Sequence, residues 1–213
     1  YRQLAKAPAP GSASRSEYWA VAEDYNVLYF VLETAPVLLL DLDGDLGSFP
    51  SFERLRGVSW VASRHYTSST LTNRSLFSIF TSMYPPASGP VLYEPDLKVP
   101  GVIQELKGRG YQTAAYLPAT LVLDWEEWMF KAMGFERMRV ADQMLDDVPN
   151  ARKNWQMKKR VDEVSLSALK DDIRYWAAED QRFAAAYLPQ IGHAPWPDIL
   201  EDGVDRDTRE RGR

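Results

Sequence analysis

Two kinds of hydrophobic pattern alternate along the chain. One is a short continuous run, and the other is a set of apolar residues spaced three or four apart, as on one face of a helix. Three short runs rich in apolar, aromatic or small residues have the length expected of buried strands: 26–32, 111–117 and 183–188. Between them, proline and glycine boundaries and apolar spacing of three and four residues predict helices at 50–57, from about 72 to 83, 100–110, 125–133 and about 161–176. The imperfect alternation from Val58 to Tyr66 is compatible with a further strand.

The order of these elements predicts the fold class. Strands alternate with helices, which indicates an α/β protein with a largely parallel sheet and helices on both faces. In such sheets ligands bind at the carboxyl ends of the strands. Glu33 follows the first predicted strand directly, and His193 lies just beyond the last one. These two strand ends are therefore where we look first for chemistry.

The chain divides into three segments. Residues 1–24 have the composition of a linker or N-terminal arm, and residues 25–200 form the predicted α/β domain. Residues 201–213 contain nine charged residues and no apolar stripe, so we expect a charged tail that leads into further polypeptide. The predicted fold would then be incomplete at the C-terminus of the chain.

Composition and charge exclude several classes of function. The chain is 45% hydrophobic and 26% charged, as in globular proteins, and its formal charge of −5 argues against nucleic acid as a partner. There is no cysteine and there are two histidines, which rules out disulfides, thiolate metal sites and a three-histidine metal site within these residues. No apolar run approaches the roughly 20 residues of a membrane span.

Two polar residues at element ends are candidates for chemistry, and each has two interpretations. Glu33 either turns into water at its strand end or is paired or bound to a metal, because a carboxylate beside a buried strand is otherwise costly. Thr72 has two possible roles. Its hydroxyl either caps the helix that begins there, or it is a reactive group beside a helix N-terminus, which would help to stabilise an alkoxide or a phosphoryl group. The residues alone leave both choices open.

Four further side chains complete the candidate set. Asn73 and Arg74 add a neutral donor and a planar cation that suit a tetrahedral oxyanion. His193 lies in a glycine- and proline-rich loop, and His65 lies between Arg64 and Tyr66; a lone loop histidine is more often only solvated.

Four segments in the right order resemble the sulfatase-like hydrolases of the alkaline phosphatase superfamily. They are the strand that ends in an acid, the helix followed by Tyr-Pro, the helix, Gly-Tyr and strand unit, and the strand before His-x-Pro: 26–34, 72–85, 99–116 and 183–196. In that family the nucleophile precedes Tyr-Pro by a fixed distance, and here Thr72 lies twelve residues before Tyr84. The resemblance spans roughly residues 25 to 197.

The threonine points to one branch of the family. Threonine cannot become the formylglycine of sulfatases, and Leu76 stands where their motif has arginine. The pattern is similar to lipoteichoic acid synthases and phosphoethanolamine transferases, which use a phosphothreonine intermediate and a divalent metal. The resemblance implies Thr72 as nucleophile, Glu33 and Thr72 as metal ligands, and His193 as a catalytic group. Asn73, Arg74 and His65 are the candidate substrate-binding residues.

The same resemblance sets expectations for cofactor, partners and location. The ion would be divalent, with Zn or Mn favoured over Mg or Ca, and the substrate a small or lipid-linked phosphodiester. Relatives imply an extracytoplasmic protein, with any membrane tether outside these residues. A sulfatase and a non-catalytic α/β binding module are the alternatives.

One feature of the family is missing. Its metal site is completed by an Asp-His pair beyond the His-x-Pro loop, and these residues contain no Asp-His dipeptide. Glu33 and Thr72 are too few ligands for a stable catalytic site. We therefore expect these 213 residues to be inactive on their own, with the remaining ligands supplied by further polypeptide.

Overall fold

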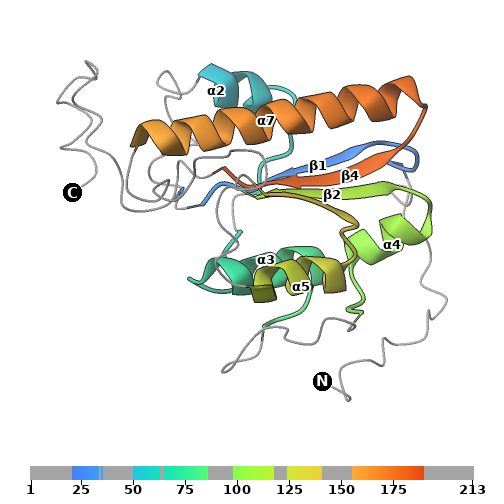
Figure 1. Ribbon diagram of the computed structural model, residues 1–213. Coiled ribbons are helices and arrows are strands. Elements are labelled where there is room, and N and C mark those ends of the chain that lie inside the picture. The colour runs from blue at the N-terminus through green and yellow to red at the C-terminus, as the bar shows by residue number, and fades with distance from the viewer. Residues whose placement is uncertain are drawn as a thin grey trace.

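In the part of the chain that the structure describes, four strands form one sheet in which every pairing is parallel (Figure 1). The computed structural model describes residues 21–33, 35, 50–62, 65–85, 98–117, 124–140 and 155–189. The strands are β1 (Val27–Phe30), β2 (Gln112–Leu117), β3 (Arg137–Val140) and β4 (Phe183–Tyr187), in the spatial order β1-β4-β2-β3. The predicted α/β class with a parallel sheet is confirmed.

Helices cover both faces of the sheet (Figure 1). The described helices are α2 (Pro50–Arg56), α3 (Thr72–Thr81), α4 (Val102–Gly108), α5 (Asp124–Met133) and α7 (Trp155–Ala178). The three helices α3, α4 and α5 lie on one face, and α7 runs along the other. None of the described helices is both long enough and apolar enough to cross a bilayer.

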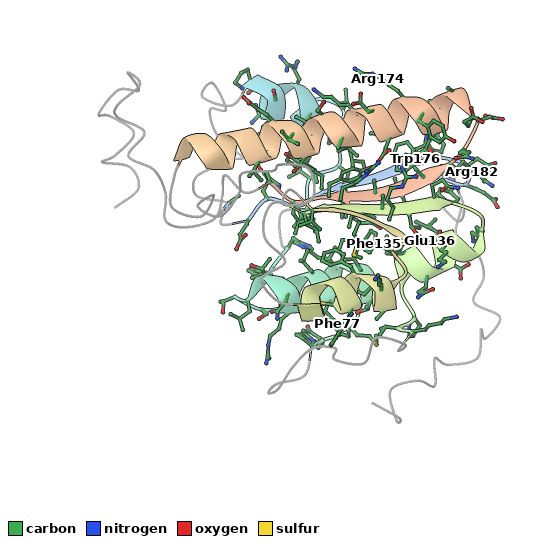
Figure 2. All side chains as sticks on the ribbon, in the orientation of Figure 1. Phe77, Phe135, Glu136, Arg174, Trp176 and Arg182 are labelled. Atoms are coloured by element: carbon green, nitrogen blue, oxygen red, sulfur yellow. The ribbon has the colours of Figure 1, made fainter. Side chains whose placement is uncertain are left out.

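Each face of the sheet has its own hydrophobic core. On the side of α3, Phe77, Phe80 and Phe135 pack with Ala184 and Ala186 of β4. On the other side, alternate strand residues pack under α7: Ala114, Tyr116, Ala185 and Tyr187 with Leu169 and Trp176. Figure 2 shows Phe77 and Phe135 on one side of the sheet and Trp176 on the other. Alanine recurs in the central strands because both of their faces are covered at close range.

The predicted elements agree with the structure within a few residues, with two exceptions. The first exception is the further strand considered for Val58 to Tyr66. That prediction is wrong over the described residues 58–62, 65 and 66, which form turns and irregular backbone. Val58 and Trp60 are 83% and 90% exposed, so these apolar side chains are not part of the hydrophobic core. The second exception is β3, which the sequence did not predict because only Met138 and Val140 of its four residues are apolar.

The predicted arm and tail are almost entirely outside the described residues. Of residues 1–24 the structure describes only 21–24, which form a turn, and it describes none of 201–213. The proposed segment boundaries therefore stay predictions.

Candidate functional site

The carboxyl end of β1 and the first residue of α3 meet through two polar side chains. Glu33 follows β1 by three residues, and Thr72 opens α3. The Thr72 hydroxyl donates a hydrogen bond of 2.8 Å to Glu33 Oε1. The structure thus brings together the two sequence-predicted metal ligands, which are 39 residues apart along the chain.

Core packing fixes the position of α3 relative to β1. Leu76, Phe77 and Phe80 form the buried stripe of α3. The ring of Phe80 meets the ring of Tyr29 edge to face, with centroids 5.3 Å apart. Burial of such aromatic pairs stabilises the contact between helix and strand. The amphipathic pattern of the helix therefore directs its N-terminus to the strand end where Glu33 lies.

Thr72 does not cap α3. Leu71 occupies the capping position with extended backbone (φ −102°, ψ 128°), and no side chain provides a capping hydrogen bond. Thr72 is the first helical residue, and its exposed hydroxyl is directed to Glu33. The local interpretation of Thr72 as a cap is wrong, which leaves a hydroxyl beside the partial positive charge of a helix N-terminus.

A cluster of three hydroxyl residues holds the segment before α3 against its first turns. Thr67 Oγ1 donates to the Ser69 carbonyl at 2.7 Å and lies 2.9 Å from Ser75 Oγ. Ser75 Oγ also donates to the Ser69 carbonyl at 2.7 Å. Sequence reasoning missed this cluster, although a run of serine and threonine directly before a helix is a recognised signal for such side-chain to backbone bonds.

The remaining candidate residues differ in where they lie. Asn73 and Arg74 share the first turn of α3 with Thr72, and Asn73 Oδ1 accepts a hydrogen bond of 2.8 Å from the Arg74 backbone N–H. His65 is exposed, and in the described part of the chain no hydrogen bond or ion pair joins it to Thr72 or Glu33. His193 lies outside the described residues.

The donor atoms at this site fit a divalent cation in part. Glu33 offers carboxylate oxygens and Thr72 a hydroxyl oxygen, which are ligand types that Mg²⁺, Mn²⁺ and Zn²⁺ accept. Within the residues that the structure describes, no group of three or more His, Cys, Asp or Glu is placed to hold a metal ion. The pair is therefore a half-site that needs additional ligands.

The fold and this site define a parallel α/β protein with a hydrogen-bonded Glu33–Thr72 pair at the carboxyl end of β1. The model of the sulfatase family matches residues 25–205, and the chain belongs to that family. No curated protein matches the chain in sequence. Membership in the family establishes the fold. The reaction has to be inferred from the residues of the site.

Two solved structures share this fold. One is a protein in the alkaline phosphatase superfamily from Vibrio parahaemolyticus, with a TM-score of 0.63, 18% identity and coverage of 85% of this chain and 44% of that one. The other is the lipoteichoic acid synthase LtaP from Listeria monocytogenes, with a TM-score of 0.67, 16% identity and coverage of 89% of this chain and 49% of that one. The chain thus spans about half the length of both structures.

Proposed function

We propose that the protein carrying this chain is a metal-dependent phosphotransferase or phosphodiester hydrolase with Thr72 as its nucleophile. The observation that supports the proposal is the hydrogen bond between Thr72 and Glu33 at the N-terminus of α3. An exposed hydroxyl, oriented by a carboxylate and lying beside a helix N-terminus, is suited to attack a phosphoryl group.

The reaction would proceed in two steps. Thr72 Oγ1 attacks the phosphorus of a phosphodiester, a new O–P bond forms, and the bond to the leaving alcohol breaks. The Thr72 proton passes to solvent water, and the leaving alkoxide takes a proton from His193 in its catalytic role, or from water. Water or an acceptor alcohol then attacks the phosphothreonine, a new O–P bond forms, and the bond between Thr72 Oγ1 and phosphorus breaks. The attacking group gives its proton to His193 or to water, and Thr72 Oγ1 takes a proton from water and is again a free hydroxyl.

Four positive or polar groups would assist this chain's own nucleophile. The N-terminus of α3 and Arg74 favour negative charge on the phosphoryl oxygens, and Asn73 and His65 are proposed to contact the substrate. A divalent ion held by Glu33 and Thr72, with Zn or Mn expected, would when bound supply charge that favours the deprotonated hydroxyl. Its remaining ligands would come from polypeptide outside these 213 residues.

Phosphoryl transfer is favoured over sulfate ester hydrolysis because of the residue at position 72. A threonine cannot supply formylglycine, whereas its hydroxyl can form a phosphate ester. The fold shared with a lipoteichoic acid synthase supports a small or lipid-linked phosphodiester as substrate. We propose an extracytoplasmic location on the same ground.

The test is metal analysis of the full-length protein together with turnover of bis-p-nitrophenyl phosphate. We expect a bound divalent metal and a rate that falls at least about 10³-fold in Thr72→Ala, as for removal of other nucleophiles. Ser78→Ala is the control, because Ser78 lies in the same helix and its hydroxyl bonds to the Arg74 carbonyl.

Each alternative has its own outcome in this experiment. Turnover of p-nitrophenyl sulfate in place of the phosphodiester would show a sulfatase and reject the proposal. Absence of bound metal and of turnover in the wild-type protein would leave a non-catalytic α/β binding module.

A further inference from the structure

The two members of the Thr72–Glu33 pair are held in place by different parts of the structure. The sheet holds the side of Glu33, because the Val31 backbone N–H donates a hydrogen bond of 3.0 Å to the Tyr187 carbonyl of β4. Thr72 is the first residue of α3, and Leu71 before it gives the helix no side-chain cap. Since helix ends fray, the first turn of α3 has to be fixed in another way.

Ser75 binds two carbonyl groups of the segment that leads into Thr72. Its backbone N–H donates to the Leu71 carbonyl at 3.0 Å, and its hydroxyl donates to the Ser69 carbonyl at 2.7 Å. Helical side chains lean toward the N-terminus of their helix, so Ser75 Oγ is directed back over this segment. One residue of α3 thus holds the backbone before Thr72 at two points.

Thr67 adds a second tie that also passes through Ser75. Thr67 Oγ1 donates to the Ser69 carbonyl at 2.7 Å and lies 2.9 Å from Ser75 Oγ. The first of these bonds stays within the segment, whereas the contact with Ser75 Oγ reaches α3. Removal of the Ser75 hydroxyl therefore breaks both side-chain ties to the helix, and removal of the Thr67 hydroxyl breaks one.

The core fixes Ser75 itself. Ser75 is half-buried and directly precedes Leu76 and Phe77, whose side chains are 4% and 1% exposed in the core on the α3 side of the sheet. Closely packed interiors leave such residues little freedom to move. The position of the core is thereby passed through Ser75 to the backbone at Thr72.

We propose that Ser75, supported by Thr67, is a positioning residue for the nucleophile. Its hydroxyl fixes the backbone at Thr72, so that Thr72 Oγ1 stays directed toward Glu33 and toward the phosphorus of the substrate. The proposal rests on the phosphoryl transfer proposed above, because it assigns Ser75 a part in that reaction. Misplacement of a reacting group by about 1 Å can lower a rate by about 10²-fold, which gives such a support its value.

Turnover of bis-p-nitrophenyl phosphate by the full-length protein tests the proposal. We expect Ser75→Ala to lower kcat by about 10- to 100-fold and to leave KM within about twofold, because Ser75 acts on the nucleophile and not on substrate binding. Ser75→Thr keeps the hydroxyl and should restore kcat, and Thr67→Val should lower kcat by less than Ser75→Ala. Ser78→Ala is the control, because the Ser78 hydroxyl bonds to the Arg74 carbonyl within the same helix.

Two measurements separate positioning from a loss of folded protein. Denaturant unfolding gives the folded fraction of each variant, by which kcat is corrected; a purely structural role would change the unfolding midpoint and leave the corrected kcat at the wild-type value. Amide hydrogen exchange does not depend on activity. The Leu71 N–H donates to Ser69 Oγ at 3.2 Å, and we expect its exchange to be at least about fivefold faster in Ser75→Ala than in Ser78→Ala.

The outcomes distinguish this proposal from the proposed function. Turnover that is lost in Thr72→Ala but unchanged in Ser75→Ala would overturn the positioning role and leave phosphoryl transfer standing. Turnover that persists in Thr72→Ala, or is absent from the wild type, would reject the proposed function and this role with it. A higher KM at unchanged kcat, or a loss that Ser75→Thr does not restore, would also overturn the proposal. Thr67→Val, at an exposed residue, carries the test should Ser75→Ala fail to fold.

Discussion

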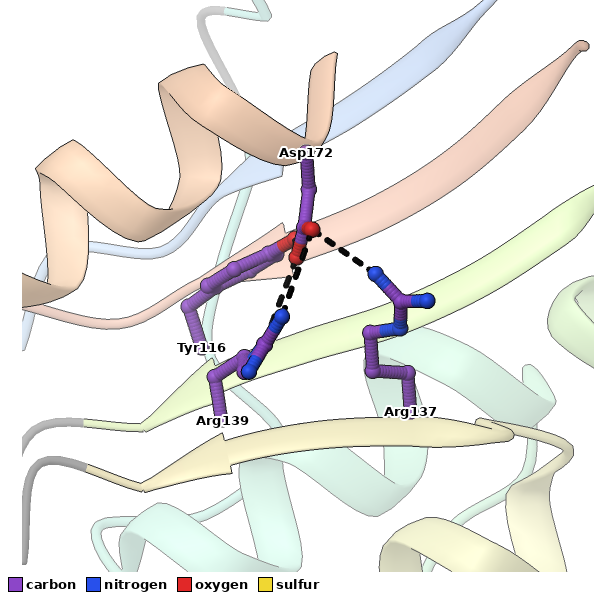
Figure 3. A network of polar contacts seen from close by, with 4 residues as sticks. All are labelled: Tyr116, Arg137, Arg139 and Asp172. Atoms are coloured by element: carbon purple, nitrogen blue, oxygen red, sulfur yellow. Dashed lines mark hydrogen bonds and ion pairs between the residues drawn. The ribbon is translucent and has the colours of Figure 1, made fainter. Parts of the chain in front are cut away.

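Asp172 shows how a single charged residue ties α7 to the sheet. It is 8% exposed and accepts hydrogen bonds from Tyr116 at 2.7 Å, from Arg137 at 2.7 Å and from Arg139 at 3.4 Å (Figure 3). Desolvation raises the pKa of Asp172, but the hydrogen bonds from Tyr116 and Arg139 and the nearby arginine charges outweigh it and lower the pKa overall. Burial and the bond to Asp172 raise the pKa of Tyr116, which therefore remains a donor.

We predict that Asp172→Asn destabilises the protein by about 2 kcal/mol at neutral pH, below the cost of a fully buried pair because both arginines are partly exposed. The lowered pKa of Asp172 means that its contribution is present above its unfolded pKa of about 3.9 and is lost as the pH falls through the folded value. The difference in unfolding free energy between wild type and variant should therefore shrink below about pH 4.

Chemical denaturation as a function of pH measures this difference. Asp171→Asn is the matched control, since Asp171 is exposed and pairs only with Arg174 among the ion pairs of the described residues. Its effect should stay within about 0.5 kcal/mol. A pH-independent difference for Asp172→Asn would contradict the assignment of a lowered pKa.

At the scale of elements, the contact between α3 and α4 depends on a glycine. A Cβ atom added at Gly101, just before α4, would overlap the carbonyl oxygen of Phe80 in α3 and lie 3.1 Å from the Thr81 Cα. The obstacle is backbone and cannot move aside cheaply. The close approach of these helices therefore requires glycine at this position.

Gly101→Ala is expected to lower the unfolding free energy by about 2 kcal/mol, through forced separation of α3 from α4. Gly108→Ala is the control, because a Cβ there meets nothing within 4 Å and lies in a helix. That change should be neutral or stabilising by up to about 1 kcal/mol. Thermal or chemical unfolding measures both, and equal effects would show that the α3–α4 contact does not depend on Gly101.

The elements that could be predicted from the sequence are those with a strong apolar pattern. Helix α3 and strands β2 and β4 have continuous apolar signals, and the sequence predicted them nearly to their ends. Strand β3 has the sequence Arg-Met-Arg-Val, in which the arginines face Asp172. These ion pairs join β3 to α7 across more than 30 residues of sequence, so no local apolar pattern contains them. The spacing of Val161, Leu169 and Trp176 indicated the buried face of α7. Asp172 lies on that face as well, three residues after Leu169, but it was not among the residues predicted from the sequence.

At the scale of the whole molecule, the place of the site could be anticipated from the sequence and its details could not. Topology directed attention to the strand end at Glu33, and the resemblance to the family implied that Glu33 and Thr72 together bind a metal. The direction of the Thr72 hydroxyl toward Glu33, and not toward the backbone of α3, depends on the register between Phe80 and Tyr29. Such a register is a property of packed side chains and cannot be derived from hydrophobic spacing.

The role of Thr72 as a covalent nucleophile is tested most directly by trapping the phosphoryl group on the protein. Full-length, metal-loaded protein is mixed with bis-p-nitrophenyl phosphate, quenched rapidly in acid and digested with trypsin, which cleaves after Arg64 and Arg74. The account predicts a p-nitrophenylphosphoryl adduct on peptide 65–74, localised to Thr72 by fragmentation. An adduct on another residue, or turnover at the wild-type rate in Thr72→Ala, would contradict it.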